Sequence, residues 1–427
     1  MNYSQAIEYL YGSLPVFHHI GADAYKPGLE NSIRLMDYFD NPQNVYRTIH
    51  IAGTNGKGSV SHFLSAILQS AGYKTGLYTS PHLVDFRERI RINGEMISEN
   101  YVTEFVESNK DVFDNIKPSF FETTMAMAFK YFADNEVDIA VIETGLGGRL
   151  DSTNIILPEL SIITNIGFDH TQFLGNTLEQ IAQEKAGIIK TNVPAIIGES
   201  TETTKSIFIK KANSGILFAE DEFDIELVEY QDDIMIVNAT SYGKLKVGLY
   251  GEYQLKNIAT VLTAVKELVS HGIAIFEEDI KLGLKNVVSL TGIQGRWQIL
   301  QKQPTIVVDT GHNIEGIRWV VNQLKKQHFD KLHIVFGMVS DKDVSSVLKL
   351  LPPIATYYFV QANIPRAMDA NVLREKANMF FLSGNAYSTV WEGVTAARQN
   401  AKTTDFIFIG GSNFVVGEVL AFYNNFL

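Results

Sequence analysis

The hydrophobic positions of this chain form short runs rich in Ile and Val, and stretches with helical spacing separate many of these runs. Such runs are typical of strands buried on both faces, and strands alternating with helices indicate a parallel α/β sheet. After the first run, apolar residues at helical spacing predict a helix that contains Val60, Phe63, Leu64 and Ile67. In the first half of the chain, the predicted strands lie in residues 46–53, 74–80, 138–145, 160–167 and 193–198.

The pattern changes twice in the rest of the chain. Residues 215–250 alternate apolar and polar positions between turn signals, which predicts a small antiparallel excursion. Residues 290–297 are rich in glycine and lack a period, so we place a boundary there and expect domains at 1–295 and 296–427. The expected fold is α/β, with a parallel-rich N-terminal sheet and a smaller Rossmann-like C-terminal domain. The predicted strands of that second domain lie in residues 305–313, 331–340, 356–362 and 405–412.

Composition narrows the class of protein. A length of 427 residues exceeds one ordinary core and supports two domains. The absence of cysteine excludes disulfides and Cys-ligated metals. A net charge of −12 disfavours nucleic acid as a partner, and no apolar run approaches the roughly 18 residues that span a membrane. The first residues do not resemble a signal peptide, so we expect a cytoplasmic monomer that binds neither nucleic acid nor membranes.

A glycine-rich turn, "GTNGKGS", connects the first predicted strand to the first predicted helix. In such a turn, backbone N–H groups converge on one point, the helix dipole adds positive potential, and a lysine supplies a full charge. The turn departs from the usual P-loop pattern, because Ile51 stands where the first glycine belongs and a further glycine follows the lysine. The alternative is a plain turn with a surface lysine. The strand–turn–helix context instead favours a nucleotide-phosphate site formed by Gly53, Thr54, Asn55, Gly56, Lys57, Gly58 and Ser59.

Two other predicted strands end in side chains that can bind ligands. Glu143 closes one apolar run, and Asp169 and His170 follow another. Ligands bind at the carboxyl ends of parallel strands, and a buried carboxylate must be paired, solvated or metal-bound. These residues are therefore candidates for a binding site, whereas a lone histidine elsewhere would more often be structural.

The order of motifs along the chain resembles the folate branch of the Mur ligase superfamily, the folylpolyglutamate synthases. The series includes "GTNGKGS", "GLYTSPHL", "VIETGLGGRLDSTN", "EQIAQEKAGIIK", "GEYQLKN", "GRW" and "DTGHN". This resemblance implies a P-loop ATPase domain and an ATP-dependent carbon–nitrogen ligase that uses Mg²⁺ ions, two by our expectation. The enzyme would add L-glutamate to the polyglutamate tail of tetrahydrofolate through an acyl phosphate. Relatives often act on dihydropteroate as well, so we favour a bifunctional enzyme and keep a monofunctional folylpolyglutamate synthase as the alternative.

The same resemblance implies roles for single residues. It places metal at Ser80, Glu143 and His170, and catalytic functions at Lys57, Lys185 and the candidate base His312. Lys185 would be carbamylated by carbon dioxide, whereas by its position alone it would be a surface lysine on a helix. ATP would contact Asn257, Arg296 and Asp309. The acceptor would contact Phe120, Phe121, Glu122, Leu150, Asp151 and Ser152, although the two phenylalanines could equally be core residues.

One motif departs from the family pattern, and two other functions stay under consideration. The family more often has Asp-Gly-Ala-His-Asn where this chain has Thr310 and Gly311, which leaves the local backbone shape open. A Mur ligase for a UDP-linked substrate is disfavoured because only 52 residues precede Gly53. An ATP-binding regulator without catalysis is disfavoured because the residues whose loss would indicate it are all present, namely Lys57, Glu143, His170 and Lys185.

Overall fold

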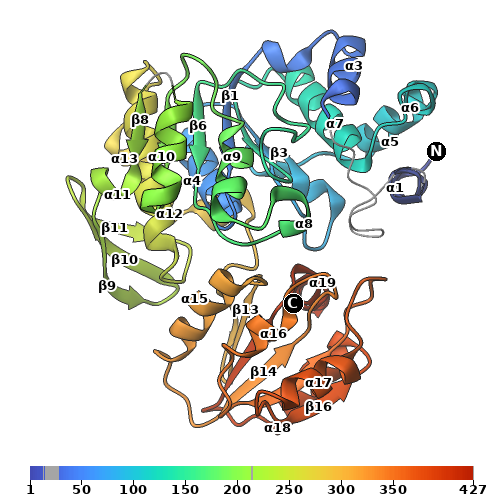
Figure 1. Cartoon of the computed structure of the whole chain (residues 1–427), viewed down its shortest axis with the longest axis vertical. Coiled ribbons are helices and arrows are strands. Elements are labelled where there is room, and N and C mark those ends of the chain that lie inside the picture. Colours follow the sequence, from blue (N-terminus) through green and yellow to red (C-terminus); the bar gives the residue numbers. More distant parts are fainter. Residues whose placement is uncertain (13, 15–27, 213–214, 427) are drawn as a thin grey trace. The chain divides into compact units, whose positions relative to one another are not determined.

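The structure is a computed structural model that describes residues 1–12, 14, 28–212 and 215–426. It divides into two compact units, whose chain order can be followed by colour in Figure 1. The first unit comprises Met1–His82, Phe86–Gly248 and Gln254–Ile293. The second comprises Gln294–Leu427 together with Leu83–Asp85 and Leu249–Tyr253, two short segments that no sequence pattern indicated.

An eight-stranded sheet organises the first unit, in the order β4-β3-β2-β5-β1-β6-β7-β8. Strands β2, β5, β1, β6, β7 and β8 run parallel, and β3 and β4 add an antiparallel edge. In the register of the three central strands, Ile51 lies beside Glu143 and Ile162, so the strand ends share one edge. The bounds are β1 (Arg47–Ala52), β2 (Thr75–Tyr78), β3 (Ile90–Ile92), β4 (Glu95–Met96), β5 (Ile139–Glu143), β6 (Leu160–Ile163), β7 (Ala195–Ile197) and β8 (Ile216–Phe218).

Helices cover this sheet, and the predicted helix after the first strand is its most buried one. That helix, α4, runs over Lys57–Ser70, and every side chain from Ser59 to Leu68 is buried. The other helical segments of the first unit are α1 (Tyr3–Gly12), α3 (Glu30–Tyr38), η2 (Pro42–Asn44), η3 (Phe86–Arg89), α5 (Glu99–Ser108), α6 (Lys110–Ile116), α7 (Phe120–Asp134), α8 (Thr171–Leu174), α9 (Leu178–Ala186), α10 (Glu202–Lys211), α11 (Ala219–Glu222), α12 (Gln254–Ser270), α13 (Glu277–Lys285) and α14 (Val287–Thr291).

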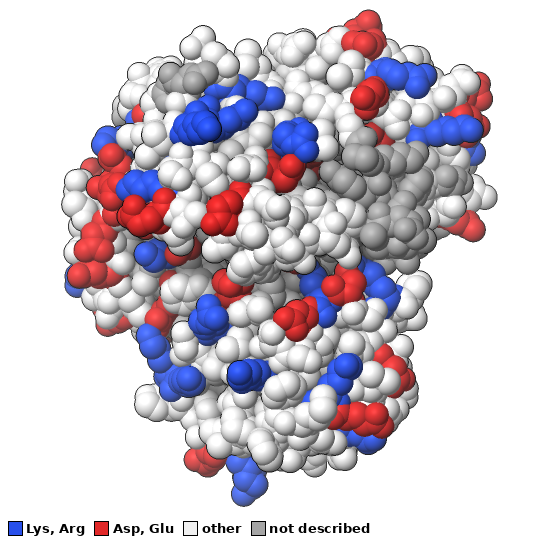
Figure 2. Space-filling view, in the orientation of Figure 1, with Lys and Arg blue, Asp and Glu red and all other residues white. Residues whose placement is uncertain are grey.

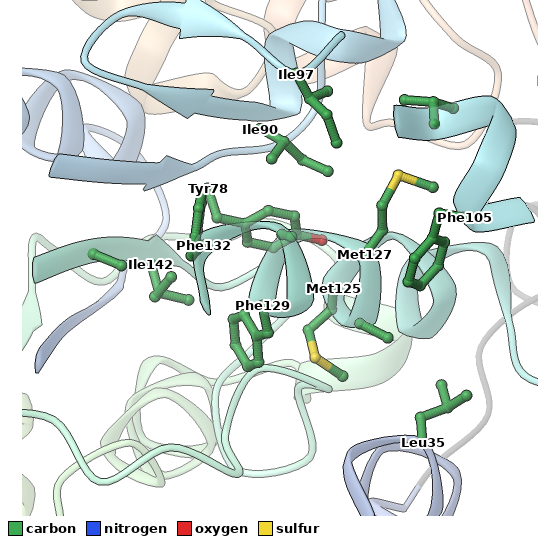
Figure 3. Packing of buried hydrophobic residues seen from close by; sticks show 14 of the residues in the cluster. Leu35, Tyr78, Ile90, Ile97, Phe105, Met125, Met127, Phe129, Phe132 and Ile142 are labelled. Carbon is green, nitrogen blue, oxygen red and sulfur yellow. The ribbon is translucent and has the colours of Figure 1, made fainter. Parts of the chain in front are cut away.

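The core beside α7 is built from aromatic and methionine side chains (Figure 3). Met125, Phe129 and Phe132 recur at helical spacing along α7 and belong to the same buried cluster as Tyr78 of β2. Each is fully buried, and burial of a large apolar side chain stabilises a fold by about 1.5–3 kcal/mol. At the N-terminal end of α7, the Phe121 ring meets the Tyr78 ring edge-on, with 5.9 Å between centroids, which holds this helix end at the carboxyl end of β2.

The prediction of an antiparallel excursion over residues 215–250 is wrong at its start. Strand β8 pairs in parallel with β7 and belongs to the main sheet. Only β9 (Ile225–Gln231), β10 (Ile234–Ala239) and β11 (Gly243–Val247) form an antiparallel sheet. The physical difference is that apolar and polar residues alternate along β9 and β11, as expected for strands with one solvated face.

A six-stranded sheet organises the second unit, in the order β12-β13-β17-β14-β15-β16. All neighbours are parallel except the edge strand β12, whose pairing with β13 is antiparallel. Helices lie on both faces, with α15, α16 and α17 on one core and α18 and α19 on the other, which confirms the Rossmann-like prediction. The bounds are β12 (Gln298–Lys302), β13 (Thr305–Asp309), β14 (Leu332–Phe336), β15 (Thr356–Val360), β16 (Gly384–Tyr387), β17 (Phe406–Gly410), α15 (Ile314–Leu324), α16 (Val344–Leu348), α17 (Ala370–Asn378), α18 (Val390–Asn400) and α19 (Asn413–Phe426).

Among the helices of the described residues, none combines the length and the apolar character needed to cross a bilayer. On the face drawn in Figure 2, acidic and basic side chains are interspersed, and no continuous basic stripe runs across it.

Candidate active site

The glycine-rich turn lies directly between β1 and α4, and two of its glycines have no substitute. Gly53 has a φ of +150°, and a Cβ there would lie 1.8 Å from the Thr164 hydroxyl oxygen. Gly56 has a φ of +83°, and its Cβ would lie 2.4 Å from Oδ1 of Asn257. Both positions are left-handed and crowded, so only glycine fits them without strain. Helix α4 begins at Lys57, which places Gly58 and Ser59 in its first turn rather than in the loop.

Residues that follow β6 hold this turn in place. The Asn165 side chain accepts a hydrogen bond from Asn55 N at 2.9 Å, and Thr164 Oγ1 donates to Asn55 O at 2.6 Å. The Thr54 hydroxyl donates to Gly167 O at 3.1 Å and accepts from Gly167 N at 3.0 Å. The side chain of Thr54 and the backbone of Asn55 therefore shape the turn, and the turn is tied to the segment that carries Asp169 and His170.

Two lysines meet at the start of α4. Lys57 Nζ donates to Gly53 O at 3.1 Å, and Lys185 Nζ, from the end of α9, donates to the same oxygen at 2.8 Å. Lys185 is 4% exposed. Burial, together with the positive charge of Lys57, lowers the pKa of Lys185 to about 7. A much larger share of this amine is therefore neutral at physiological pH than for an ordinary lysine, which no sequence pattern indicated.

Glu143 and Ser80 complete the centre of the site. Glu143 is the last residue of β5, is buried, and places Oε1 at 3.9 Å from Lys57 Nζ. The backbone N–H of Ser80, in the loop after β2, donates to Glu143 Oε2 at 3.4 Å. The structure thus brings together Lys57, Ser80, Glu143 and, through the shared Gly53 carbonyl, Lys185.

His170 lies in the segment after β6, where it precedes α8. Its backbone N–H donates to Asp169 Oδ1 at 2.8 Å, and its ring Nε2 lies 3.9 Å from the same oxygen. Within the described part of the chain, no three His, Asp or Glu residues lie close enough to hold a metal ion by themselves. The oxygen donors of Glu143 and Ser80 nevertheless fit a Mg²⁺ ion, because Mg²⁺ takes few protein ligands and keeps water or phosphate oxygens.

Asp151 follows β5 and is one of the residues predicted to contact the folate acceptor. Its carboxylate accepts hydrogen bonds from its own loop. Oδ2 accepts from the N–H groups of Gly145 and Leu146, each at 2.8 Å. Oδ1 accepts from the Thr153 N–H at 3.0 Å and from the Thr153 hydroxyl. A carboxylate offers about four acceptor positions, so Asp151 organises this loop with all of them. The neighbouring Ser152 hydroxyl is buried and has no hydrogen-bond partner among the described residues, whereas Leu150 is half-buried.

Three residues at the start of α7 are predicted to contact the folate acceptor, and each has a different environment. Glu122 forms a capping box with Ser119: the Ser119 N–H donates to Glu122 Oε2 at 2.6 Å, and the Glu122 N–H donates to Ser119 Oγ at 3.2 Å. Phe120 is buried, with the Tyr11 ring stacked at 5.0 Å between centroids. Phe121 is only half-buried, so of the two rings it is the one with surface left for a ligand.

Asn257 is held by a residue that sequence reasoning missed. Its Nδ2 donates to Gln254 Oε1 at 2.7 Å, and Gln254 Nε2 donates to Ser59 Oγ at 3.2 Å. Gln254 is completely buried. The three-residue spacing on one helix face, next to a predicted ligand, was a signal that could have identified it.

The remaining predicted residues gather at the end of β13 in the second unit. Asp309 accepts hydrogen bonds from Tyr253 OH at 2.7 Å, Trp297 N at 2.8 Å and Gly311 N at 2.8 Å. Burial raises the pKa of Asp309, and these donors oppose that shift. Tyr253 is a second residue that the motif reading passed over.

Arg296 and His312 both contact Thr310. The Arg296 guanidinium donates to the Thr310 hydroxyl, and the His312 ring Nδ1 lies 2.9 Å from the Thr310 carbonyl oxygen. Thr310, one of the two departures from the family pattern, thus supplies an acceptor that glycine lacks.

Comparisons with known proteins show which family this chain is similar to. Residues 51–265 match the family model of the Mur ligase middle domain, and residues 295–413 match that of the Mur ligase glutamate ligase domain. A dihydrofolate synthase/folylpolyglutamate synthase of Bacillus subtilis is 32% identical over 92% of this chain and 94% of that protein.

Solved structures show the same similarity over the whole length. Escherichia coli FolC in complex with DHPP and ADP has a TM-score of 0.85 at 28% identity, with 100% of this chain and 98% of that chain covered. A bifunctional folylpolyglutamate synthase/dihydrofolate synthase with Mn, AMPPNP and L-glutamate bound has a TM-score of 0.83 at 28% identity, with 99% and 98% covered.

Proposed function

This chain belongs to the folate branch of the Mur ligase family, the dihydrofolate synthases/folylpolyglutamate synthases, and on that premise we propose how its residues perform the reaction. It is an ATP-dependent ligase that joins L-glutamate to a folate acceptor. The observation that carries the residue assignment is the cluster at the β1, β2 and β5 ends: Lys57 and Lys185 share the Gly53 carbonyl, and Glu143 lies beside Lys57 and Ser80.

The chain activates a carboxylate by phosphorylating it, because a carboxylate and an amine do not condense at neutral pH. The glycine N–H groups of the turn and the Lys57 ammonium hold and align the β- and γ-phosphates of ATP. Glu143 and Ser80 would hold a divalent ion, which would supply charge neutralisation during phosphoryl transfer. The acceptor carboxylate attacks the γ-phosphorus, ADP leaves, and an acyl phosphate is formed.

The amine of L-glutamate then replaces phosphate at the acyl carbon. We assign the removal of its proton to His312. Because Nδ1–H of His312 donates to the Thr310 carbonyl, the neutral ring carries its lone pair on Nε2, which is the basic atom. Arg296, fixed by the Thr310 hydroxyl, and Asn257, fixed by Gln254, contact ATP in this assignment.

Lys185 is carbamylated in this assignment. A neutral amine attacks CO₂, an N–C bond forms and one proton is released, which converts a cation into an anion with two oxygens. The pKa of about 7 supports this step, since the reactive neutral amine is present at neutral pH. With His170, the carbamate would give a second divalent ion its protein ligands. Incubation with ¹³C-bicarbonate should give a carbamate carbon signal in the NMR spectrum that Lys185→Met lacks.

We favour a bifunctional enzyme, with dihydropteroate and tetrahydrofolate as acceptors. The test measures ADP release with ATP, Mg²⁺ and L-glutamate, with each acceptor in a separate reaction and L-glutamate omitted as the control. Activity with both acceptors supports the proposal, and activity with tetrahydrofolate alone makes the enzyme a dedicated folylpolyglutamate synthase. Lys57→Met should lower kcat/KM by about 10²–10³-fold with either acceptor, because its charge faces the transferring phosphoryl group.

A further inference from the structure

Arg89 is a buried cation to which the reaction assigns no part. It ends η3, is 2% exposed, and among the described residues no carboxylate lies within ion-pair distance of it. Burial disfavours its charged form and lowers its pKa. A buried guanidinium without a carboxylate partner is destabilising. Its hydrogen bonds then indicate which groups it holds in place.

Arg89 forms hydrogen bonds with the loop that carries Ser80 at two points. Its carbonyl oxygen accepts a hydrogen bond from Thr79 N at 3.0 Å, and its Nε donates to His82 Nδ1 at 2.8 Å. Between these two anchors, the Ser80 N–H points to the Glu143 carboxylate at 3.4 Å. The loop that supplies one side of the metal site is therefore held from both ends by one residue.

Through His82, Arg89 is also linked to the N-terminal helix α1. Because Arg89 donates to Nδ1, the neutral His82 ring carries its proton on Nε2, which lies 3.1 Å from the Tyr11 hydroxyl of α1. The guanidinium thus selects one tautomer of His82 and orients the ring.

The same guanidinium also contacts the start of α7, where the predicted acceptor residues lie. Its central carbon lies 5.2 Å from the centroid of Phe120, at the start of α7, and Phe120 in turn stacks on Tyr11. Such a cation–π contact is stronger when it is shielded from water. One side chain therefore connects the loop of Ser80 to the helix end that presents Phe121.

We propose that Arg89 is a positioning residue that fixes the Thr79–His82 loop for divalent-ion binding and couples this loop to the start of α7, which presents Phe121. The inference rests on the proposed function, in which Ser80 and Glu143 hold the ion. Lysine should not replace Arg89, because an ammonium lacks the extended planar group whose Nε donates to His82 while its central carbon lies over the Phe120 ring.

The experiment measures Mn²⁺ binding by EPR in the presence of AMPPNP, without turnover, and then KM for the acceptor and for ATP. Arg89→Gln and Arg89→Lys should weaken Mn²⁺ binding by about 10- to 100-fold, as expected for a residue that orients a metal ligand. The KM for the acceptor should rise, while the affinity for metal-free ADP stays unchanged. The matched control is Arg91→Gln, which removes a buried guanidinium two residues away that donates to Gly94 O at 2.8 Å, outside the loop.

A second variant keeps the proposal testable if Arg89→Gln folds poorly. His82→Gln leaves Arg89 in place and should reproduce the loss of Mn²⁺ affinity, and the double variant should lose little more than either single one. Mn²⁺ binding by both variants equal to that of the wild type, or a loss equal to that of Arg91→Gln, would overturn the role of Arg89. Failure of the wild type itself to bind Mn²⁺ with AMPPNP would instead contradict the proposed function.

Discussion

Lys57 and Lys185 approach the same carbonyl oxygen, and this contact decides the chemistry available to each. Two ammonium groups that share one partner repel each other, and Lys185 is the more buried of the two, so Lys185 is the one whose pKa falls. Lys57 keeps the ion pair with Glu143. One lysine is thereby suited to bind phosphate and the other to react as a neutral amine.

Lys185→Met should stabilise the protein in a pH-dependent way. The unfolded chain keeps this proton up to the ordinary pKa of 10.5, whereas the folded protein releases it above about 7. The unfolded state therefore binds more protons between these values, and the destabilisation from Lys185 is largest below about pH 7 and fades as the pH rises. Urea unfolding in bicarbonate-free buffer should show the largest gain for Lys185→Met at about pH 6 and a smaller gain at about pH 9. A gain that does not vary with pH would contradict the lowered pKa.

Gly56→Ala should weaken nucleotide binding more than it destabilises the fold. The added Cβ meets Asn257 Oδ1 at 2.4 Å in a backbone conformation with φ of +83°, so the turn must shift. We expect ADP affinity to fall by at least about tenfold, which corresponds to 1.4 kcal/mol, within the range of backbone strain. Titration calorimetry with ADP measures this, with Gly72→Ala as a control. Gly72 also has a positive φ, but its Cβ would meet open space.

Among the elements, the loops after β2, β5 and β6 determine the site more than the strands do. The strands place these loops at one edge of the sheet, and the loops then bind one another: Asn165 holds the turn after β1, and Glu143 receives the Ser80 N–H. The loop after β5 is closed by Asp151. Asp151, which the motif order predicts to contact the acceptor, therefore also organises its own loop.

Variants of Glu122, at the start of α7, test whether this residue caps its own helix or contacts the acceptor. Glu122→Ala removes the capping box and should lower the free energy of unfolding by about 0.5–2 kcal/mol, as measured by urea unfolding. Glu122→Gln keeps an acceptor for the Ser119 N–H and should restore most of that stability. The KM for the acceptor should change little in either variant. A large rise in this KM for both variants would show that Glu122 contacts the acceptor directly.

On the scale of the whole molecule, each unit has its own sheet and its own buried cores. In the first unit the sheet edge carries the phosphate turn, and in the second the end of β13 carries Asp309, Arg296 and His312.

We expect the protein to be a monomer in solution. A net charge of −12 disfavours self-association. Size-exclusion chromatography with light scattering should give a mass of 47.7 kDa that does not depend on protein concentration. A mass near twice that value, persisting on dilution, would contradict the monomer.

The sequence by itself determined the α/β class, the strand–turn–helix around Gly53 and the family, because hydrophobic period, glycine placement and motif order are local properties of the chain. It did not indicate the edge strands β12 and β16, whose residues are only partly buried or exposed and carry a weak apolar signal. Only the tertiary structure decided the lowered pKa of Lys185 and the hydrogen bonds of the Asp151 carboxylate to its own loop. The same holds for the hydrogen bond from Gln254 to Ser59 and for that from Arg89 to His82. Each of these depends on burial or on a partner distant in sequence, and burial and distance exist only once the strands and loops have been brought together.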